Sequence, residues 1–287
     1  MSTRNNRQRS VNDRIRRAAD AQGVDANRLR RGLVFQRLLV RLAPHGVVLK
    51  GGYCLEVRLP GVARVTKDMD LVGHIAIADD PAEVQDALDE LLDDDSSKDD
   101  FTFRVGRPVR LRDSEAEDRA WRVSVAAYLG GAQFETVKID LVGQIEEVLG
   151  ATEPMTVDPP VAIPGIEGVI VEAVDIYQHA AEKLHAYSRM YAHDRPSSRV
   201  KDLVDLVLMI EAGLLVDHSR LRDRLLIVHS LRDNGEPGAE LPAPPRDWAQ
   251  SYAAVAHELA LAAETVDIAY ARVAEIYQQA VSRRRTQ

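Results

Sequence analysis

Two aspartates separated by a single residue, Asp68 and Asp70, give the strongest chemical signal in the sequence. Side chains at positions i, i+2 and i+4 of a β-strand point to one face, so we expect Thr66, Asp68 and Asp70 to emerge together. Two neighbouring carboxylates repel each other, and a divalent cation allows both to stay ionised. Oxygen ligands at this spacing suit Mg²⁺, which keeps waters and substrate phosphates in its shell. Residues 64–71 therefore predict one half of a metal and phosphate site.

Two adjacent glycines, Gly51 and Gly52, predict the other half of that site. They follow a short apolar strand at 47–50 and precede a helical stretch at 53–58. Glycine permits positive φ and a close approach of backbone N–H groups, which at a helix N-terminus favours an anion such as a triphosphate. The chain has no GxxxxGK[ST] sequence, so this is not a Walker loop.

A third carboxylate, Asp140, lies in a strand predicted at 133–142. Residues 120–129 form its hairpin partner through Gly130 and Gly131, and another strand is expected at 101–109. Lys138 and Asp140 share one face of the strand. A two-metal site needs a third carboxylate from a neighbouring strand, and Asp140 is our candidate. Taken alone, an aspartate in a strand is more often a surface residue.

Lys183, Asp202 and Asp205 lie in helices where a charged side chain is costly unless it pairs or binds a ligand. Lys183 interrupts a mostly apolar helix. Asp202 and Asp205 are spaced i and i+3, so they share one helix face. Spacing alone leaves two alternatives open, an interhelix salt bridge and a ligand site.

Four motifs in this order resemble the AbiE-type (AbiEii-like, MenT) toxins of the polymerase-β-like nucleotidyltransferases. They are K-G-G-x-x-L-x-x-R at 50–58, R-x-T-x-D-x-D-L at 64–71, K-L-H-A at 183–186 and R-x-x-D-L-x-D-L at 199–206. The resemblance implies an α+β fold, in which a polymerase-β-like nucleotidyltransferase sheet domain is followed by a C-terminal helical bundle domain.

The resemblance also implies roles for individual residues. Gly51 and Gly52 would bind the nucleotide phosphates, Thr66 and Asp68 would lie on the active-site strand, and Asp70 would be a second metal ligand. In the later motifs, Lys183 would contact the triphosphate and Asp205 would be an acidic catalytic residue. Further triphosphate contacts would come from Arg64, Arg199 and Lys201. With Asp140 added as the third metal ligand, either Asp140 or Asp205 would orient or deprotonate the acceptor.

The implied activity is a Mg²⁺-dependent transfer of NMP from an NTP to the 3′ end of tRNA, with release of pyrophosphate. The product would block translation, and a cognate antitoxin would be encoded nearby. Two alternatives stay open. The acceptor could be a hydroxyl of a protein or a small molecule, or the chain could be a catalytically silent nucleotide- or RNA-binding module.

Composition indicates a globular protein, with 45% hydrophobic and 29% charged residues in 287. No apolar run approaches the roughly 18 residues that span a bilayer, and the basic N-terminus lacks the apolar segment of a signal peptide, so we expect a cytoplasmic protein without a membrane partner. We also expect a monomer. Residues 1–31 carry nine arginines and three aspartates, a net charge of +6. Because the formal charge of the whole chain is −8, the remainder carries −14. A basic arm on an acidic body can bind a phosphate backbone, although it could equally be a solvated end.

Three regions are expected along the chain: a disordered basic arm at 1–12, a nucleotidyltransferase domain at 13–150 that begins with two helices, and a helical domain at 151–287. The proline-rich segment 150–168 would join the two domains. Helices are expected at 80–92, 172–192, 199–213, 217–232 and 247–281, and the acidic run 93–100 as a solvated loop. The histidines have neither HExxH nor His-x-Glu spacing, so no zinc site is predicted, and His185 is expected to pack between helices.

Overall fold

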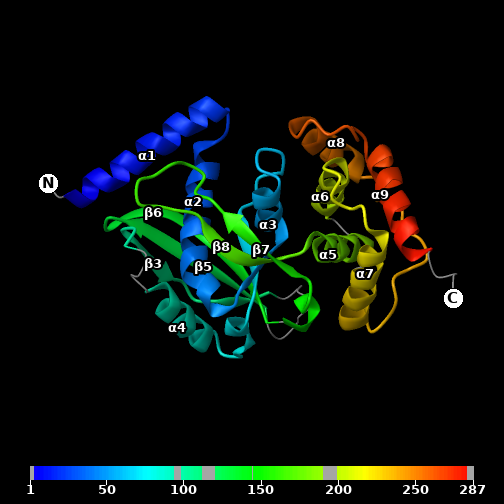
Figure 1. Cartoon of the computed structure of the whole chain (residues 1–287), viewed down its shortest axis with the longest axis horizontal. Coiled ribbons are helices and arrows are strands. Elements are labelled where there is room, and N and C mark those ends of the chain that lie inside the picture. The colour runs from blue at the N-terminus through cyan, green and yellow to red at the C-terminus, as the bar shows by residue number, and fades with distance from the viewer. Residues whose placement is uncertain (1–2, 94–97, 112–119, 144, 190–198, 283–287) are drawn as a thin grey trace. The chain divides into compact units, whose positions relative to one another are not determined.

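A computed structural model describes residues 3–93, 98–111, 120–143, 145–189 and 199–282 (Figure 1). The chain divides into two compact units. The sheet unit consists of Met1–Val57, Val65–Glu146 and Thr152–Ala173, and the helical unit of Arg58–Arg64, Glu147–Ala151 and Val174–Gln287. The expected α+β class with a helical C-terminal part is confirmed.

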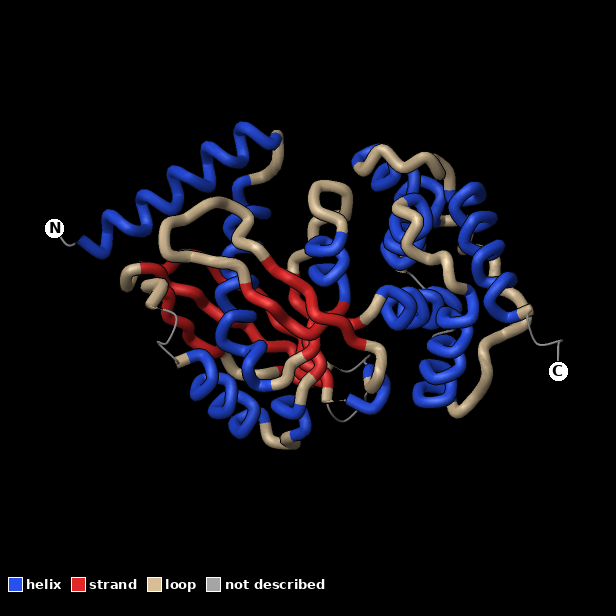
Figure 2. Tube along the Cα trace, viewed as in Figure 1, coloured by secondary structure: helices blue, strands red, loops and turns tan. Residues whose placement is uncertain are grey.

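A mixed eight-stranded sheet forms the core of the first unit, with the strand order β3-β5-β6-β2-β1-β8-β7 and with β4 paired to β5 (Figure 2). The strands are β1 (Val48–Lys50), β2 (Asp68–Val72), β3 (Phe101–Val105), β4 (Val109–Arg110), β5 (Ala120–Leu129), β6 (Ala132–Val142), β7 (Thr152–Val157) and β8 (Val169–Val174). The central strand β2 runs antiparallel to β1 and parallel to β6. The predicted β5–β6 hairpin is confirmed, and Gly130 and Gly131 both have positive φ in its turn.

The described part of the sheet unit contains four helices: α1 (Thr3–Gln22), α2 (Ala26–Leu42), α3 (Gly51–Arg58), whose last residue is assigned to the helical unit, and α4 (Pro81–Leu92). Helix α2 packs against β6, and α4 packs against β3. Helix α4 begins as predicted, since the Asp80 side chain accepts a hydrogen bond from the backbone N–H of Ala82 at 2.8 Å. Short 3₁₀ turns occupy Ala43–His45, His74–Ile77 and Ile145–Val148.

The basic N-terminal segment is helical where disorder was expected, because α1 starts at Thr3. Residues 1 and 2 lie outside the described part of the chain. Val11 and Ile15 are 1% and 0% exposed, so burial of apolar side chains holds this arginine-rich segment to the rest of the unit.

Asp99 corrects the expectation that the acidic run is a solvated loop. The side chain is fully buried and accepts hydrogen bonds from Arg41 at 2.9 and 3.1 Å and from Arg37 at 3.3 Å. Both arginines come from α2, so a buried charge cluster connects this helix to the segment before β3. Residues 94–97 of the run lie outside the described part.

The described part of the second unit contains five helices: α5 (Ile176–Ser188), α6 (Val200–Glu211), α7 (His218–Asp233), α8 (Trp248–Glu258) and α9 (Val266–Val281). Helix α5 packs on α6 and α7, and α9 packs on α6, α7 and α8. Within the residues that the structure describes, none of the helices combines the length and the apolar character needed to cross a membrane.

The single helix expected at 247–281 is two helices. The backbone turns at Ala260, which has a φ of +51°, and the Thr265 side chain caps α9. The Glu211 carboxylate accepts hydrogen bonds from the backbone N–H groups of Ala262 and Ala263 at 3.2 and 3.0 Å. These bonds satisfy backbone donors in the connecting loop.

The boundary between the units differs from the join expected at 150–168. Residues 152–173 belong to the sheet unit, because the proline-rich loop connects two strands of the sheet, β7 and β8. The helical unit resumes at Val174, where the Asp175 side chain caps α5 by accepting from the backbone N–H of Gln178 at 2.7 Å.

Candidate active site

Three predicted carboxylates meet on one face of the sheet. In the parallel pair of β2 and β6, Asp70 lies opposite Asp140, and Asp68 lies opposite Lys138. Positions 68 and 70 share one face of β2, and their register partners share the same face of β6. The structure therefore brings Asp68, Asp70 and Asp140 together, and it places a lysine beside them.

Arg122 on β5 joins this carboxylate cluster, and our sequence analysis missed it. Its guanidinium donates two hydrogen bonds to Asp140, at 2.7 and 2.6 Å, and lies 3.5 Å from Asp68 Oδ2. The hydrogen bonds to Asp140 raise the pKa of Arg122, although partial burial acts in the opposite direction. Arg122 thus provides positive charge at the place where the sequence predicted a cation.

Gly51 is required where it stands. Its φ of +66° favours glycine, and a Cβ added there would collide with the Asp70 carboxylate. Helix α3 begins at Gly51, two residues earlier than expected, so Asp70 lies beside a helix N-terminus. The helix dipole favours a negative charge at that end, so the position suits the Asp70 carboxylate.

Thr66 does not share the strand face, because β2 begins only at Asp68. Its backbone N–H donates to Glu56 Oε2 at 3.2 Å, and its hydroxyl donates to the backbone carbonyl of Asp68 at 3.2 Å. Glu56 in turn accepts from Arg28 at 2.7 Å. These bonds fix the loop that leads into β2, and they leave Thr66 only 5% exposed.

A second cluster lies in the helical unit around Lys183 on α5. Its Nζ is 2.6 Å from Asp205 Oδ2 and 3.2 Å from Asp202 Oδ1, both on α6. Arg64 donates two hydrogen bonds of 2.8 Å to the Asp205 carboxylate. Arg199 lies 2.9 Å from Asp202. The interhelix salt bridge that the sequence left open is therefore present.

Charge coupling in this cluster outweighs burial. Burial alone would lower the pKa of Lys183, but the carboxylates of Asp205 and Asp202 raise it above its ordinary value. Burial alone would raise the pKa of Asp205, but Lys183 and Arg64 lower it. Both groups are charged near neutral pH. Lys201 is exposed on α6, and the Arg199 side chain is about half exposed.

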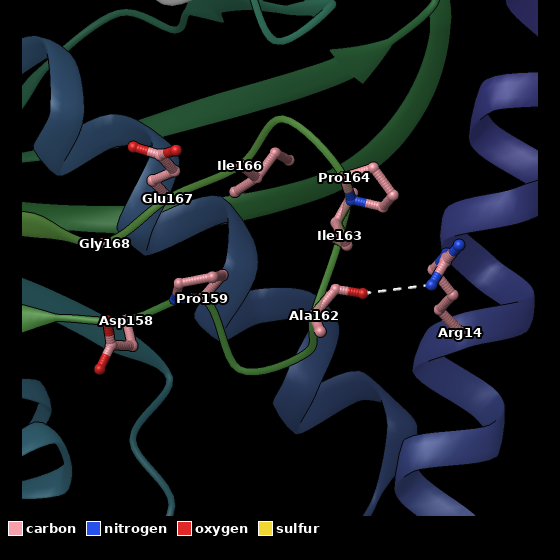
Figure 3. A pocket seen from close by; sticks show the side chains of 9 residues that line it. All are labelled: Arg14, Asp158, Pro159, Ala162, Ile163, Pro164, Ile166, Glu167 and Gly168. Atoms are coloured by element: carbon pink, nitrogen blue, oxygen red, sulfur yellow. Dashed lines mark hydrogen bonds between the residues drawn. The ribbon is translucent and has the colours of Figure 1, made fainter.

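A cavity of about 630 Å³ in the sheet unit lies between α1 and the loop that joins β7 to β8 (Figure 3). Arg14 donates to the backbone carbonyl of Ala162 at 3.4 Å, and apolar side chains such as Ile163 and Ile166 line the wall. None of its lining residues belongs to the predicted site. The hydrogen bond from Arg14 shows how the loop holds the arginine-rich helix.

Comparison with known proteins decides the family. The family model described as nucleotidyl transferase AbiEii toxin, Type IV TA system, matches residues 34–276. The chain belongs to the AbiEii nucleotidyl transferase toxin family. No curated protein sequence matches it.

Two solved structures match most of the chain. MenT4, a nucleotidyltransferase toxin from Mycobacterium tuberculosis H37Rv, is 19% identical over 87% of this chain and 82% of that chain, with a TM-score of 0.50. A nucleotidyltransferase candidate from H. pylori is 15% identical over 92% of this chain and 100% of that chain, with a TM-score of 0.48. At 19% identity, the likeness to MenT4 shows the fold alone.

Membership of the AbiEii family makes this chain a nucleotidyltransferase. Such enzymes generally use an NTP and a divalent metal, and the Type IV toxin–antitoxin classification implies an antitoxin partner.

Proposed function

We propose that this AbiEii-family enzyme transfers NMP from an NTP to the 3′ end of tRNA in a Mg²⁺-dependent reaction, and that the modified tRNA no longer supports translation. The observation that carries the chemistry is the meeting of Asp68, Asp70 and Asp140 beside the N-terminus of α3. The observation that favours RNA is the set of exposed arginines on α1.

The donor set fits Mg²⁺, because carboxylate oxygens are the ligands this ion prefers. Asp68 and Asp70 would hold it, and Asp140 could join them once it shares its oxygens between Arg122 and the metal. When bound, the ion stabilises the charge that develops on the transferring phosphate. The backbone N–H groups of Gly51 and Gly52 bind nucleotide phosphates at the start of α3.

In the helical unit, we assign phosphate binding to Lys183, Arg64 and Arg199 of the second cluster, and to the exposed Lys201 of α6. The two bonds from Arg64 and the short bond from Lys183 occupy the Asp205 carboxylate. A carboxylate with a lowered pKa is a weak base, so we assign Asp205 the positioning of Lys183 and Arg64. Asp140 is then the better candidate to orient the acceptor hydroxyl.

Incubation with total tRNA, Mg²⁺ and each α-labelled NTP in turn tests the acceptor. We expect label in the tRNA band, and no labelling of tRNA whose 3′-terminal diol has been oxidised with periodate before the incubation. Label on a protein or on a small molecule would replace tRNA as the acceptor. Pyrophosphate formation without label on RNA would contradict the tRNA proposal, although the protein would still be a nucleotidyltransferase. We also propose that the enzyme acts as a monomer.

A further inference from the structure

Two histidines and an aspartate meet in the helical unit, and none of the three has been given a catalytic or nucleotide-binding role above. His185 comes from α5, and His229 and Asp233 lie one turn apart on α7. One potential ligand atom from each residue lies within 4.8 Å of the other two. The histidines are 44 positions apart in sequence, which is why motif spacing gave no sign of this group.

Two of the three distances between the potential ligand atoms are close to those of a metal site. His185 Nε2 is 2.8 Å and His229 Nδ1 is 3.3 Å from Asp233 Oδ2. Ligand atoms at about 2.0–2.2 Å from a tetrahedral Zn²⁺ are roughly 3.3–3.5 Å apart. The His229 and Asp233 atoms already have that separation, and the distance from His185 to Asp233 needs to lengthen by about half an ångström.

The surroundings favour a cation. Asp233 is the last residue of α7 and His229 lies one turn before it, so both are near the end at which the helix dipole is negative. A cavity of about 440 Å³ opens onto the three side chains, and Glu236, Glu240 and Arg189 are among the described residues that line it. The two histidines are 1% and 8% exposed, while the Asp233 side chain is 47% exposed at the mouth.

We propose that His185, His229 and Asp233 form a Zn²⁺ site whose fourth position faces this cavity. Two imidazoles and one carboxylate with an open position are a zinc donor set, and imidazole excludes Mg²⁺ as the preferred ion. The metal joins α5 to α7. Lys183 lies two residues before His185, so zinc binding would stabilise the position of the helix that carries the buried lysine.

The test uses the full-length protein, stripped of metal with a chelator and titrated with Zn²⁺ in excess Mg²⁺ against a chromophoric competitor. We expect one tight Zn²⁺ per chain and a rise in Tm on binding. Co²⁺ in place of Zn²⁺ should give the intense visible bands of a four-coordinate ion. Because removal of an outer-shell partner already costs 10–100-fold in affinity, His229→Gln and Asp233→Asn should weaken binding by about 100-fold or more.

Two controls locate the ion. His257→Gln removes an exposed histidine of α8, and Asp68→Asn removes a carboxylate of the sheet; both should bind Zn²⁺ as the parent does. Asp233→Asn keeps a hydrogen-bond acceptor at a half-exposed position, so it should fold without metal. The proposal is overturned if the parent binds no Zn²⁺ tightly, if both ligand variants bind it unchanged, or if Asp68→Asn abolishes binding. In each case the three side chains are a hydrogen-bonded network only.

Discussion

Arg122 changes the account of the active site at the scale of single residues. Three carboxylates on one sheet face need a counter-charge, and the Arg122 guanidinium provides it through two bonds to Asp140 and a longer interaction with Asp68. The same cation therefore prevents repulsion between the carboxylates and competes with a metal for Asp140. Removing it should make the cluster depend on metal for its stability.

We expect Arg122→Met to lower the free energy of unfolding by about 1 kcal/mol without divalent cations, a small value because the side chain is partly exposed and screened. Millimolar Mg²⁺ should raise the Tm of this variant more than that of the parent, as measured by thermal melts in both conditions. Arg104→Met, at an exposed arginine of β3, is the matched control and should show no added response. An equal Mg²⁺ response in Arg122→Met and the parent would contradict the assigned role.

His179 is a second residue with a measurable signature. It is 1% exposed on α5, and burial, with a further contribution from Lys183, lowers its pKa to about 3. The unfolded chain takes up a proton near pH 6.5 and the folded chain does not, so this histidine costs stability as pH falls from 6.5 towards 3.

When the pH is lowered from 7 to 5, the free energy of unfolding of the parent should therefore fall by about 2 kcal/mol more than that of His179→Leu. Urea denaturation at the two pH values measures the difference. His257→Leu, at an exposed position on α8, should lose as much as the parent. Identical losses in His179→Leu and the parent would show that His179 is protonated in the folded state.

Elements bring these residues together, and one detail of the β5–β6 hairpin limits what sequence could predict. Both strands and their two-glycine turn are where the pattern placed them. Counting outward from that turn pairs Asp140 with Trp121. An irregularity at Ala127 and Tyr128 shifts the register by one residue, so that Arg122 faces Asp140 instead. A one-residue shift in register moves every side chain of a strand to the opposite face relative to its partner strand. No residue type in the hairpin predicts this shift.

The same limit applies elsewhere in the site. Period-2 patterning placed Asp68 with Asp70, but the pairing of Asp70 with Asp140 depends on which strands become neighbours in the sheet. Helical spacing predicted that Asp202 and Asp205 share a face, and both contact Lys183. The bonds from Arg64 to Asp205 join residues 141 positions apart, which local patterns do not encode.

The buried ion pairs between α2 and the segment before β3 give a prediction about how these two elements are held together. Asp99→Asn leaves the charges of Arg37 and Arg41 without their carboxylate, and it should cost about 3–5 kcal/mol of unfolding free energy. Asp100→Asn is the adjacent control, because the Asp100 side chain is 58% exposed; it should change stability by no more than about 0.5 kcal/mol. Urea unfolding of both variants decides, and equal effects would show that Asp99 is solvated.

At the scale of the whole molecule, the charge of the chain is divided between a basic N-terminal helix and an acidic remainder. Deleting residues 1–31 is a poor test of RNA binding, because it would also remove core side chains such as Val11 and Ile15. Arg9, Arg16 and Arg17 are exposed on α1 and can be changed while the core stays intact.

Replacing these three arginines by glutamine should weaken tRNA binding and lower the slope of log affinity against log salt by about one for each RNA phosphate that the protein no longer neutralises. Filter binding at several salt concentrations measures the slope. The matched triple replacement by lysine keeps the charge and should keep the slope. An unchanged slope in the glutamine variant would mean that α1 does not bind RNA.

The most direct test of the central claim is the rate of pyrophosphate release with total tRNA and each NTP, measured across a Mg²⁺ titration in the parent and in Asp68→Asn. We predict release that requires Mg²⁺ and that falls by about 10³-fold in the variant, since metal stabilisation of the transferring phosphate contributes several kcal/mol. Asp86→Asn, at an exposed aspartate of α4, should release pyrophosphate at the parent rate. Release that persists in Asp68→Asn, or that is independent of Mg²⁺, would contradict a catalytic metal on the carboxylates of β2.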